Sequence, residues 1–243
     1  FVGRHVVRAL VERGYSVRAL ARKPGREEVV NFDKVEMRYA DVFDADAMRD
    51  AMNGVDAVVH LVAIIKERKG ATFSNVNYLG TANVVTTAKW AGFEHFVHMG
   101  AIGSQNNPRF PYLQSKWLGE HAVGSSNVPY TILRGSLLFG PGDEFISTLA
   151  GVVKAFPVVP MAGNGRARFQ PIHVEDVARC IAQAIEQDGL RNRTLEIGGP
   201  EVLTYNEIID AITLTYFLRR LKLHVPIPLM RILVWFMEKL LPN

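Results

Sequence analysis

Short apolar runs alternate with longer stretches of helical spacing along the first 140 residues of the chain. The apolar runs have the length and residue types of β-strands, and they cover residues 15–21, 35–39, 55–61, 93–99 and 130–134. The stretches between them repeat apolar positions at helical spacing, and they cover residues 3–13, 44–52, 74–91 and 112–123. Strands separated by helices predict βαβ units and a parallel sheet.

The pattern loosens after residue 140. Helices are predicted over residues 145–156 and 174–186, and a strand over 194–197. The segment Thr204-Tyr205-Asn206-Glu207 has the spacing of a capping box, which predicts the start of another helix. We therefore expect an α/β protein with a doubly wound parallel sheet over residues 1–140 and a smaller C-terminal α/β lobe over residues 141–243, not fully separable from it.

Composition and charge argue against several classes of protein. Of the 243 residues, 48% are hydrophobic and 21% charged, as in an ordinary soluble globular protein. The net charge is +4, but the basic residues are mostly scattered, so we expect no nucleic-acid partner. Cys180 is the single cysteine, which excludes an internal disulfide, and no Cys/His cluster has metal-site spacing. No apolar run reaches the roughly 18 residues of a membrane span. We expect a cytoplasmic protein, with a peripheral position at the inner face of a membrane as an alternative.

Tyr112 and Lys116 are the most informative side chains, because they stand four residues apart on a predicted helix after the apolar run 93–99. This spacing places them on one helix face. An ammonium beside a phenol favours the ionised phenol and makes it a better acid or base near neutral pH. Such a pair suits a proton transfer to or from a carbonyl oxygen while a hydride moves to or from the carbon. The alternative is a half-buried aromatic beside a surface lysine, and spacing alone does not exclude it.

The chain begins with Phe1-Val2-Gly3 directly before a predicted helix. These residues have the pattern of the end of a glycine-rich dinucleotide loop, with Gly3 as the last glycine, which lets the helix pack close to the sheet. The helix N-terminus would then face a pyrophosphate. On this interpretation the first strand and the phosphate loop are missing from this chain, and the domain 1–140 is N-terminally truncated. The alternative is that Gly3 is only a helix cap.

Three further positions follow predicted strands. Arg22 comes directly after the run 15–21, where a dinucleotide fold places the adenosine ribose. A basic residue there suits a 2′-phosphate, so NADP(H) is favoured over NAD(H); a solvated turn is the alternative. Asp41-Val42 follows the run 35–39, where the carboxylate could accept a hydrogen bond from adenine or form a turn. Leu61-Val62-Ala63 ends the run 55–61, where small residues admit a cofactor, although a plain buried strand end explains them equally well.

Other motifs follow in a fixed order: Asn77-x-x-Gly80-Thr81, Leu133-Arg134-Gly135-Ser136, Phe139-Gly140-Pro141-Gly142-Asp143, Gln170–Val177 and Ile197-Gly198-Gly199-Pro200. Together with the earlier motifs, this order resembles the short-chain dehydrogenase/reductase superfamily in its extended and atypical branches. Within it, the chain is most similar to the NDUFA9-like group, named after a respiratory complex I subunit and related to NAD-dependent epimerase/dehydratase-like proteins. The resemblance implies a Rossmann fold that binds NAD(P)H, with Lys116 also bonded to the nicotinamide ribose.

The sequence departs from that family at one position that matters for catalysis. Active members carry a serine or threonine after the strand equivalent to 93–99, and its hydroxyl bonds the substrate oxygen. This chain has Gly100-Ala101 there, with Ser104 a few residues on as a candidate substitute. Without a hydroxyl, stabilisation of an oxyanion is weakened. The sequence thus leaves two hypotheses. The first is a dinucleotide-binding protein with a structural, sensing or assembly role or with weak redox activity. The second is an active NADP-dependent oxidoreductase or epimerase/dehydratase that uses Tyr112 and Lys116.

The C-terminal stretch Phe217–Leu241 interleaves basic and apolar residues. A membrane surface or a membrane-protein partner would suit this composition. The alternative is a helix that packs on the small lobe, interrupted by Pro226 and Pro228. A membrane-surface module that merely retains the fold is therefore a third hypothesis.

Overall fold

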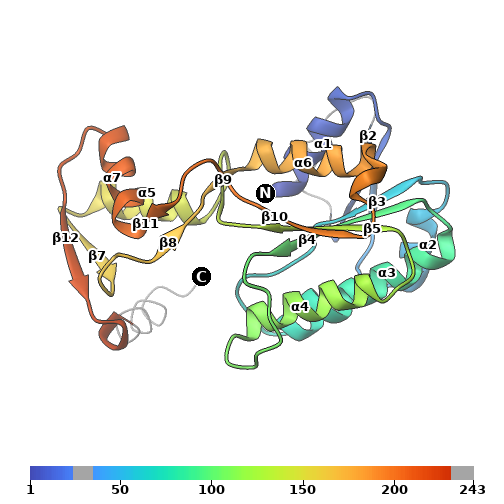
Figure 1. Ribbon diagram of the computed structural model, residues 1–243, viewed down its shortest axis with the longest axis horizontal. Coiled ribbons are helices and arrows are strands. Elements are labelled where there is room, and N and C mark those ends of the chain that lie inside the picture. Colours follow the sequence, from blue (N-terminus) through green and yellow to red (C-terminus); the bar gives the residue numbers. More distant parts are fainter. Residues whose placement is uncertain (24–34, 231–243) are drawn as a thin grey trace. The chain divides into compact units, whose positions relative to one another are not determined.

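The computed structural model describes residues 1–23 and 35–230, which divide into two compact units (Figure 1). Unit 1 contains Phe1–Ser136 and His173–Ile197, and unit 2 contains Leu137–Ile172 and the chain from Gly198 onward. A single cut at residue 140 therefore does not divide the chain. The physical reason is that strand β10 (Arg193–Ile197) returns to unit 1 and pairs in parallel with β5 (Tyr130–Gly135).

Unit 1 is built on parallel strands, as the sequence predicts. Its larger sheet has the order β10-β5-β4-β3, in which β4 is His95–Ala101 and β3 is Ala57–His60. The strands β1 (Val17–Ala21) and β2 (Val35–Tyr39) form a separate parallel pair. Within the described residues, no strand pairing joins these two sheets.

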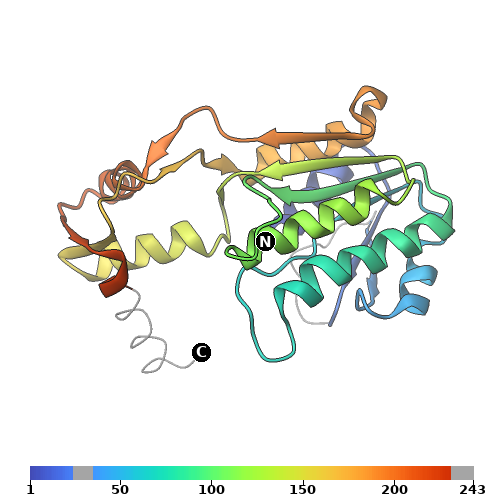
Figure 2. The same ribbon diagram turned by 60° about the horizontal axis from the view of Figure 1, so that its bottom comes forward.

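Helices cover both faces of the larger sheet, so the predicted doubly wound architecture is confirmed. Figure 1 shows α1 (Val2–Glu12) and α6 (Val174–Glu186) on one face and α3 (Gly80–Ala91) and α4 (Pro111–Gly124) on the other. Figure 2 shows α3 and α4 lying side by side. A π-helical segment, Ser74–Leu79, leads into α3. The helix α2 (Ala45–Met52) packs against α3 and is capped by the Asp44 side chain, which accepts from the Ala47 backbone N–H.

Close packing of α4 against the π-helical segment Ser74–Leu79 depends on a small residue. A Cβ atom added at Gly119 of α4 would lie 2.7 Å from the backbone oxygen of Asn77, closer than real Cβ atoms come. The core of unit 1 lies between the helices α3 and α4 and the sheet, and its fully buried side chains include Phe96, Val84 and Val123. The strand β4 is buried along nearly its whole length. The end of β4 is therefore held firmly relative to α4.

The described part of unit 2 combines helices with short strands. Its longer helices are α5 (Phe145–Ala155) and α7 (Tyr205–Thr215), and the predicted capping box between Thr204 and Glu207 is present at the start of α7. The remaining strands are β6 (Leu138–Phe139) with β9 (Ile172–His173), β8 (Arg168–Phe169) with β11 (Leu203–Thr204), and β7 (Val158–Ala162) with β12 (Leu221–Val225).

Strand β12 corrects one expectation for the C-terminal stretch. Residues Leu221–Val225 form a strand parallel to β7, where the alternative prediction had a packed helix. The register pairs Leu221 with Val158, so a distant partner decides the conformation of this segment. Residues 231–241 of the predicted stretch lie outside the described residues. Among the described helices, none combines the length and the apolar character that crossing a bilayer requires.

Candidate functional site

The residues predicted to hold a dinucleotide lie at the carboxyl ends of the parallel strands of unit 1. Arg22 follows β1, Asp41 lies two residues beyond the end of β2, and Leu61 follows β3. The start of α1 lies beside the end of β3, because a Cβ atom added at Gly3 would stand 4.0 Å from Leu61 Cδ1. In open α/β sheets, ligands bind outside the carboxyl ends of the strands.

The first three residues form the start of α1, but packing alone does not require a glycine there. Phe1 precedes the helix as its N-cap residue without a side-chain cap, and Val2 is the first helical residue. A contact of 4.0 Å from Gly3 to Leu61 is ordinary van der Waals contact, so a methyl group would fit. Within the described residues, the packing of α1 against the end of β3 therefore does not depend on glycine at position 3. The first turn of α1 contains no acidic side chain.

Asp41 and Val42 have different environments after β2. The backbone N–H of Ala40 bonds to the carbonyl of Ala21, which continues the β1–β2 pairing to the strand ends. Asp41 Oδ1 accepts a hydrogen bond from the Phe43 backbone N–H at 3.1 Å and so forms a turn. Val42 is buried in the core, with its side chain against Gly80. The side chain of Val42 therefore serves packing.

Asn77 fastens the loop after β3 to helix α4. Its side-chain oxygen accepts from the Ile64 backbone N–H at 2.8 Å, and its side-chain nitrogen donates to the Ile64 carbonyl and to Ser115 Oγ. Asn77 is almost completely buried. Asn77 thereby holds the exposed Val62 and Ala63, which precede Ile64, close to the helix that carries Tyr112.

Tyr112 and Lys116 lie on α4, but their electrostatics differ from expectation. The Tyr112 ring packs edge-on against Phe73, with ring centroids 5.6 Å apart. Burial raises the pKa of the Tyr112 phenol, whereas we expected a neighbouring cation to lower it. Lys116 is buried, and its Nζ donates a hydrogen bond to the Met99 carbonyl at 2.6 Å. Burial lowers the pKa of Lys116 to about 8, against an opposing effect of the Glu120 carboxylate.

Glu120 is a site residue that the sequence interpretation missed. Its Oε2 accepts two hydrogen bonds from Arg134, from Nε at 2.9 Å and from Nη2 at 2.8 Å. Its Oε1 accepts from the Ala101 backbone N–H at 3.4 Å. This buried carboxylate joins α4 to β4 and β5. The sequence spacing could have identified Glu120, because it follows Lys116 by four residues and therefore lies on the same face of the helix.

Gly100 makes room for this ion pair. A Cβ atom added at Gly100 would lie 2.4 Å from Glu120 Oε1 and 3.1 Å from Arg134 Cγ. A side chain at this position would therefore displace the buried carboxylate. The neighbouring Ala101 points to the opposite face of the sheet, because successive side chains alternate along a strand.

Ser104 lies in the turn that follows β4. Its backbone N–H bonds to the Ala101 carbonyl at 3.1 Å, and its hydroxyl donates to the same carbonyl at 2.7 Å. Gly103 supports this turn with a φ of +84°. With its proton directed at a backbone carbonyl, the Ser104 hydroxyl does not offer a donor to a substrate oxygen in this conformation.

Two histidines form a buried layer next to Lys116. The rings of His60 and His98 are stacked with centroids 5.4 Å apart, and His60 Nε2 bonds to Thr81 Oγ1. Burial lowers the pKa of His60 to about 3 and holds the pKa of His98 well below its ordinary value, with Lys116 contributing to both. Both imidazoles are therefore neutral near pH 7. Within residues 1–23 and 35–230, no cluster of three or more His, Cys, Asp or Glu could bind a metal ion.

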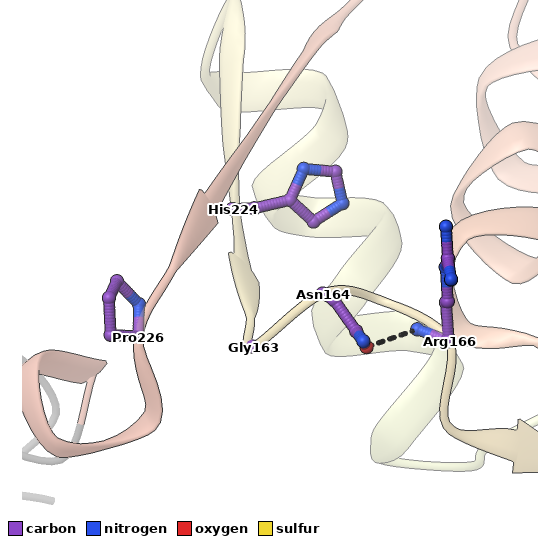
Figure 3. A pocket seen from close by; sticks show the side chains of 5 residues that line it. All are labelled: Gly163, Asn164, Arg166, His224 and Pro226. Atoms are coloured by element: carbon purple, nitrogen blue, oxygen red, sulfur yellow. Dashed lines mark hydrogen bonds between the residues drawn. The ribbon is translucent and has the colours of Figure 1, made fainter.

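A separate pocket of about 510 Å³ lies in unit 2 (Figure 3). Its lining consists of Gly163, Asn164, Arg166, His224 and Pro226. The Arg166 backbone N–H bonds to Asn164 Oδ1, and His224 Nε2 lies 3.1 Å from Asn206 Oδ1. None of the residues predicted to bind a dinucleotide lines this pocket.

Comparison with known proteins identifies similar sequences. The family described as "NAD dependent epimerase/dehydratase family" matches residues 1–198. The mitochondrial NADH dehydrogenase [ubiquinone] 1 alpha subcomplex subunit 9 of Arabidopsis thaliana is 27% identical over 220 residues, which cover 86% of this chain and 54% of that protein. A ceramide reductase of Caulobacter vibrioides is 30% identical over 178 residues, covering 73% of this chain and 56% of that protein. The chain thus spans little more than half the length of these two relatives.

A solved structure shares the fold. The UDP-glucuronic acid 4-epimerase of Bacillus cereus, in complex with UDP-glucuronic acid and NAD, superposes with a TM-score of 0.81. The two sequences are 19% identical, and the match covers 93% of this chain and 83% of the epimerase. At this identity the likeness shows a common architecture.

Proposed function

The chain belongs to the NAD dependent epimerase/dehydratase family, as its sequence motifs predict, and on that premise we propose that unit 1 binds a nicotinamide dinucleotide. The contact between the start of α1 and Leu61 supports this proposal, because it brings a helix N-terminus to the carboxyl end of a parallel strand. The pyrophosphate would lie at Phe1-Val2-Gly3. The adenosine half would lie toward Arg22 and Asp41, and the nicotinamide half toward Tyr112 and Lys116.

We propose that NADP(H) is preferred over NAD(H). Arg22 is exposed directly after β1, and among the described residues no carboxylate pairs with it. A 2′-phosphate would offer this guanidinium a charge-assisted partner. Replacing Arg22 by glutamine should weaken NADPH binding about tenfold and leave NADH binding unchanged. Lys23→Gln is the matched control, since it removes an exposed positive charge from the next residue. Equal losses for both nucleotides would exclude Arg22 as the source of preference.

We propose that the bound dinucleotide serves a structural, sensing or assembly role, with weak redox activity at most. The observation that carries this choice is the direction of the Ser104 hydroxyl, which donates to the Ala101 carbonyl. Gly100 has no side chain, and burial raises the pKa of Tyr112, which makes its phenol a poorer base near neutral pH. The likeness to a subunit of NADH dehydrogenase supports a place in a larger respiratory assembly.

The second candidate is an active NADP-dependent oxidoreductase or epimerase/dehydratase. Tyr112 and Lys116 favour it, since both side chains that such a reaction needs are present on one helix. The likeness to a ceramide reductase supports a carbonyl or hydroxyl substrate. In this case Tyr112 is the acid or base, and Lys116 positions the nicotinamide ribose.

A Tyr112→Phe variant separates the two candidates. The measurements are NADPH binding by fluorescence and NADPH oxidation with candidate carbonyl substrates. The structural role predicts that the wild-type protein and the variant bind NADPH equally and that neither oxidises it at an appreciable rate. Steady oxidation by the wild type that disappears in the variant would refute the structural role. Tyr15→Phe is the control, because Tyr15 precedes β1 at the opposite end of the sheet.

We also propose a peripheral contact with a membrane or a membrane-protein partner through the stretch Phe217–Leu241. Its described part belongs to unit 2, whereas the predicted dinucleotide residues belong to unit 1. The two functions are therefore separable by substitution.

A further inference from the structure

Helix α7 ends in a motif that normally requires glycine. The Leu218 N–H bonds to the Thr213 carbonyl at 2.9 Å, and the Phe217 N–H bonds to the Leu214 carbonyl at 3.0 Å. These two bonds form a Schellman motif, whose left-handed residue is usually glycine. Here that residue is Phe217, with a φ of +55°. A bulky side chain with this backbone conformation is strained.

Packing does not compensate for this strain in the described chain. The Phe217 side chain is 94% exposed, so it gains almost no burial from the position that it occupies. Leu214, on the last turn of α7, is 75% exposed. A large apolar side chain held in an unfavourable conformation and directed into solvent points to a contact outside the chain.

The neighbouring strand pair presents an apolar face. The register pairs Leu221 with Val158 and Leu223 with Pro160, and paired residues lie on the same face of a sheet. Leu221 is 72% exposed and Leu223 is 56% exposed. The opposite face is covered, because Lys222 of β12 bonds to Asp210 of α7 and the β7 side chains on that face are buried.

The positive charge around Phe217 and strand β12 indicates which kind of partner would bind there. The sequence contains no acidic residue between Ala211 and Met230. Arg219 is exposed, and no carboxylate of the described residues pairs with it. Arg220 donates to the Val153 and Lys154 carbonyls, so its charge is not neutralised. The charge of Lys222, in contrast, is neutralised by an ion pair with Asp210. Exposed apolar side chains with unbalanced cations are the composition that binds an anionic bilayer.

We propose that this Phe217 surface, defined as Leu214, Phe217, Arg219, Leu221 and Leu223, binds the headgroup region of an anionic phospholipid bilayer. Phe217 and the leucines enter the boundary between headgroups and acyl chains, and Arg219 pairs with lipid phosphates or carboxylates. The inference rests on the peripheral contact in the proposed function and names its partner. It does not depend on dinucleotide binding.

Co-sedimentation of the full chain with vesicles tests the proposal. One set of vesicles is phosphatidylcholine, and the other mixes it with phosphatidylserine. The protein should sediment with the mixed vesicles and remain in solution with the neutral ones. Phe217→Gly should reduce binding about tenfold, and Arg219→Gln about fivefold. Trp90→Ala and Arg8→Gln are the controls, because each removes an exposed side chain of the same kind from unit 1.

Phe217→Gly is informative because glycine suits the local backbone. This variant should unfold at the same temperature as the wild type or higher, so lost binding cannot be ascribed to misfolding. Unchanged sedimentation of Phe217→Gly, or equal binding to both vesicle types, would overturn the proposal. Phe217-dependent self-association without vesicle binding would also overturn it and would identify a second copy as the occupant. NADPH binding measured on the same samples shows separately whether the dinucleotide proposal stands.

Discussion

Replacing Glu120 by glutamine tests whether a buried ion pair holds the site together. The Glu120 side chain is 5% exposed and that of Arg134 is 27% exposed. The carboxylate accepts both Arg134 bonds on Oε2 and the Ala101 N–H bond on Oε1. Glutamine keeps the shape of the side chain but removes its charge. The guanidinium of Arg134 and the buried ammonium of Lys116 then lose their carboxylate.

The cost follows from the burial of the two partners. Removing one member of a buried pair costs about 3–5 kcal/mol, because the other charge is left without a partner. Partial exposure of Arg134 lets water replace some of the lost interaction, so we expect a loss of about 2–4 kcal/mol in the free energy of unfolding. For a chain of this size, such a loss lowers the melting temperature by about 10 °C.

Glu186→Gln is the matched control. Glu186 pairs with Arg13 at 3.3 Å, but the two side chains are 38% and 29% exposed. A pair with this exposure contributes at most about 1 kcal/mol. Thermal unfolding at neutral pH compares the two variants. Equal melting temperatures would refute the conclusion that Glu120 fastens α4 to the ends of β4 and β5.

A second measurement distinguishes the electrostatic role from simple packing. Glu120 opposes the effect of burial on Lys116 and helps to keep the pKa at about 8. Without the carboxylate, that pKa should fall further. The titration of the Lys116 side chain, followed by NMR with isotopically labelled lysine, reports this shift. An unchanged titration in Glu120→Gln would show that the two groups are not coupled.

The remaining predictions concern the end of β4 and the dependence of stability on pH. Gly100→Ser should destabilise the protein by about 1–3 kcal/mol, because its Cβ would overlap Glu120 Oε1; thermal unfolding checks this, and a wild-type melting temperature would contradict it. Ala101→Ser places a hydroxyl on the face of the strand opposite Glu120 and helix α4, away from Tyr112, so it should leave any NADPH oxidation unchanged; a rise in the rate of about tenfold would contradict this placement. Lys116 binds its proton more weakly in the folded state, at about 8 against an ordinary 10.5, so stability should rise by up to about 3 kcal/mol between these pH values. His60, lowered from 6.5 to about 3, should make stability fall by up to about 4–5 kcal/mol as the pH drops through that interval; urea unfolding across pH measures both, and a flat profile would refute them.

The order of strands and helices was predictable because local periodicity encodes it. The predicted helix over 174–186 coincides with α6. The strand over 35–39 coincides with β2. The return of β10 to unit 1 was not predictable in this way, because its partner β5 is about 60 residues away in the chain. Nothing in the spacing of apolar residues specifies which distant strand will be paired.

The sequence of β12 alternates in the way that a strand does, but this alternation was interpreted as a surface segment. Leu221, Leu223 and Val225 alternate with Lys222 and His224, which is the period of a strand. The interleaving of basic and apolar residues was interpreted as an amphipathic surface segment. Both descriptions fit, since Lys222 bonds to Asp210 on one face while the leucines remain exposed on the other. The conformation was decided by pairing with β7.

The places of the candidate residues along the strands were predictable, but their electrostatics were not. Arg22 follows β1 and Leu61 follows β3, as the apolar pattern predicts without any knowledge of side-chain contacts. The pKa of Tyr112 depends on burial, and helix spacing carries no information about it. Spacing indicated that Lys116 shares a helix face with Tyr112, but the Lys116 ammonium donates to the Met99 carbonyl.

Gly100 connects these observations. The sequence presents it as the loss of a hydroxyl, and hence as a reason to doubt catalysis. In the structure, the same glycine provides the space that the Glu120–Arg134 pair occupies. A side chain at position 100 would push this pair away from the Ala101 N–H and loosen the end of β4. The ion pair that joins α4 to the ends of β4 and β5 therefore requires glycine at position 100.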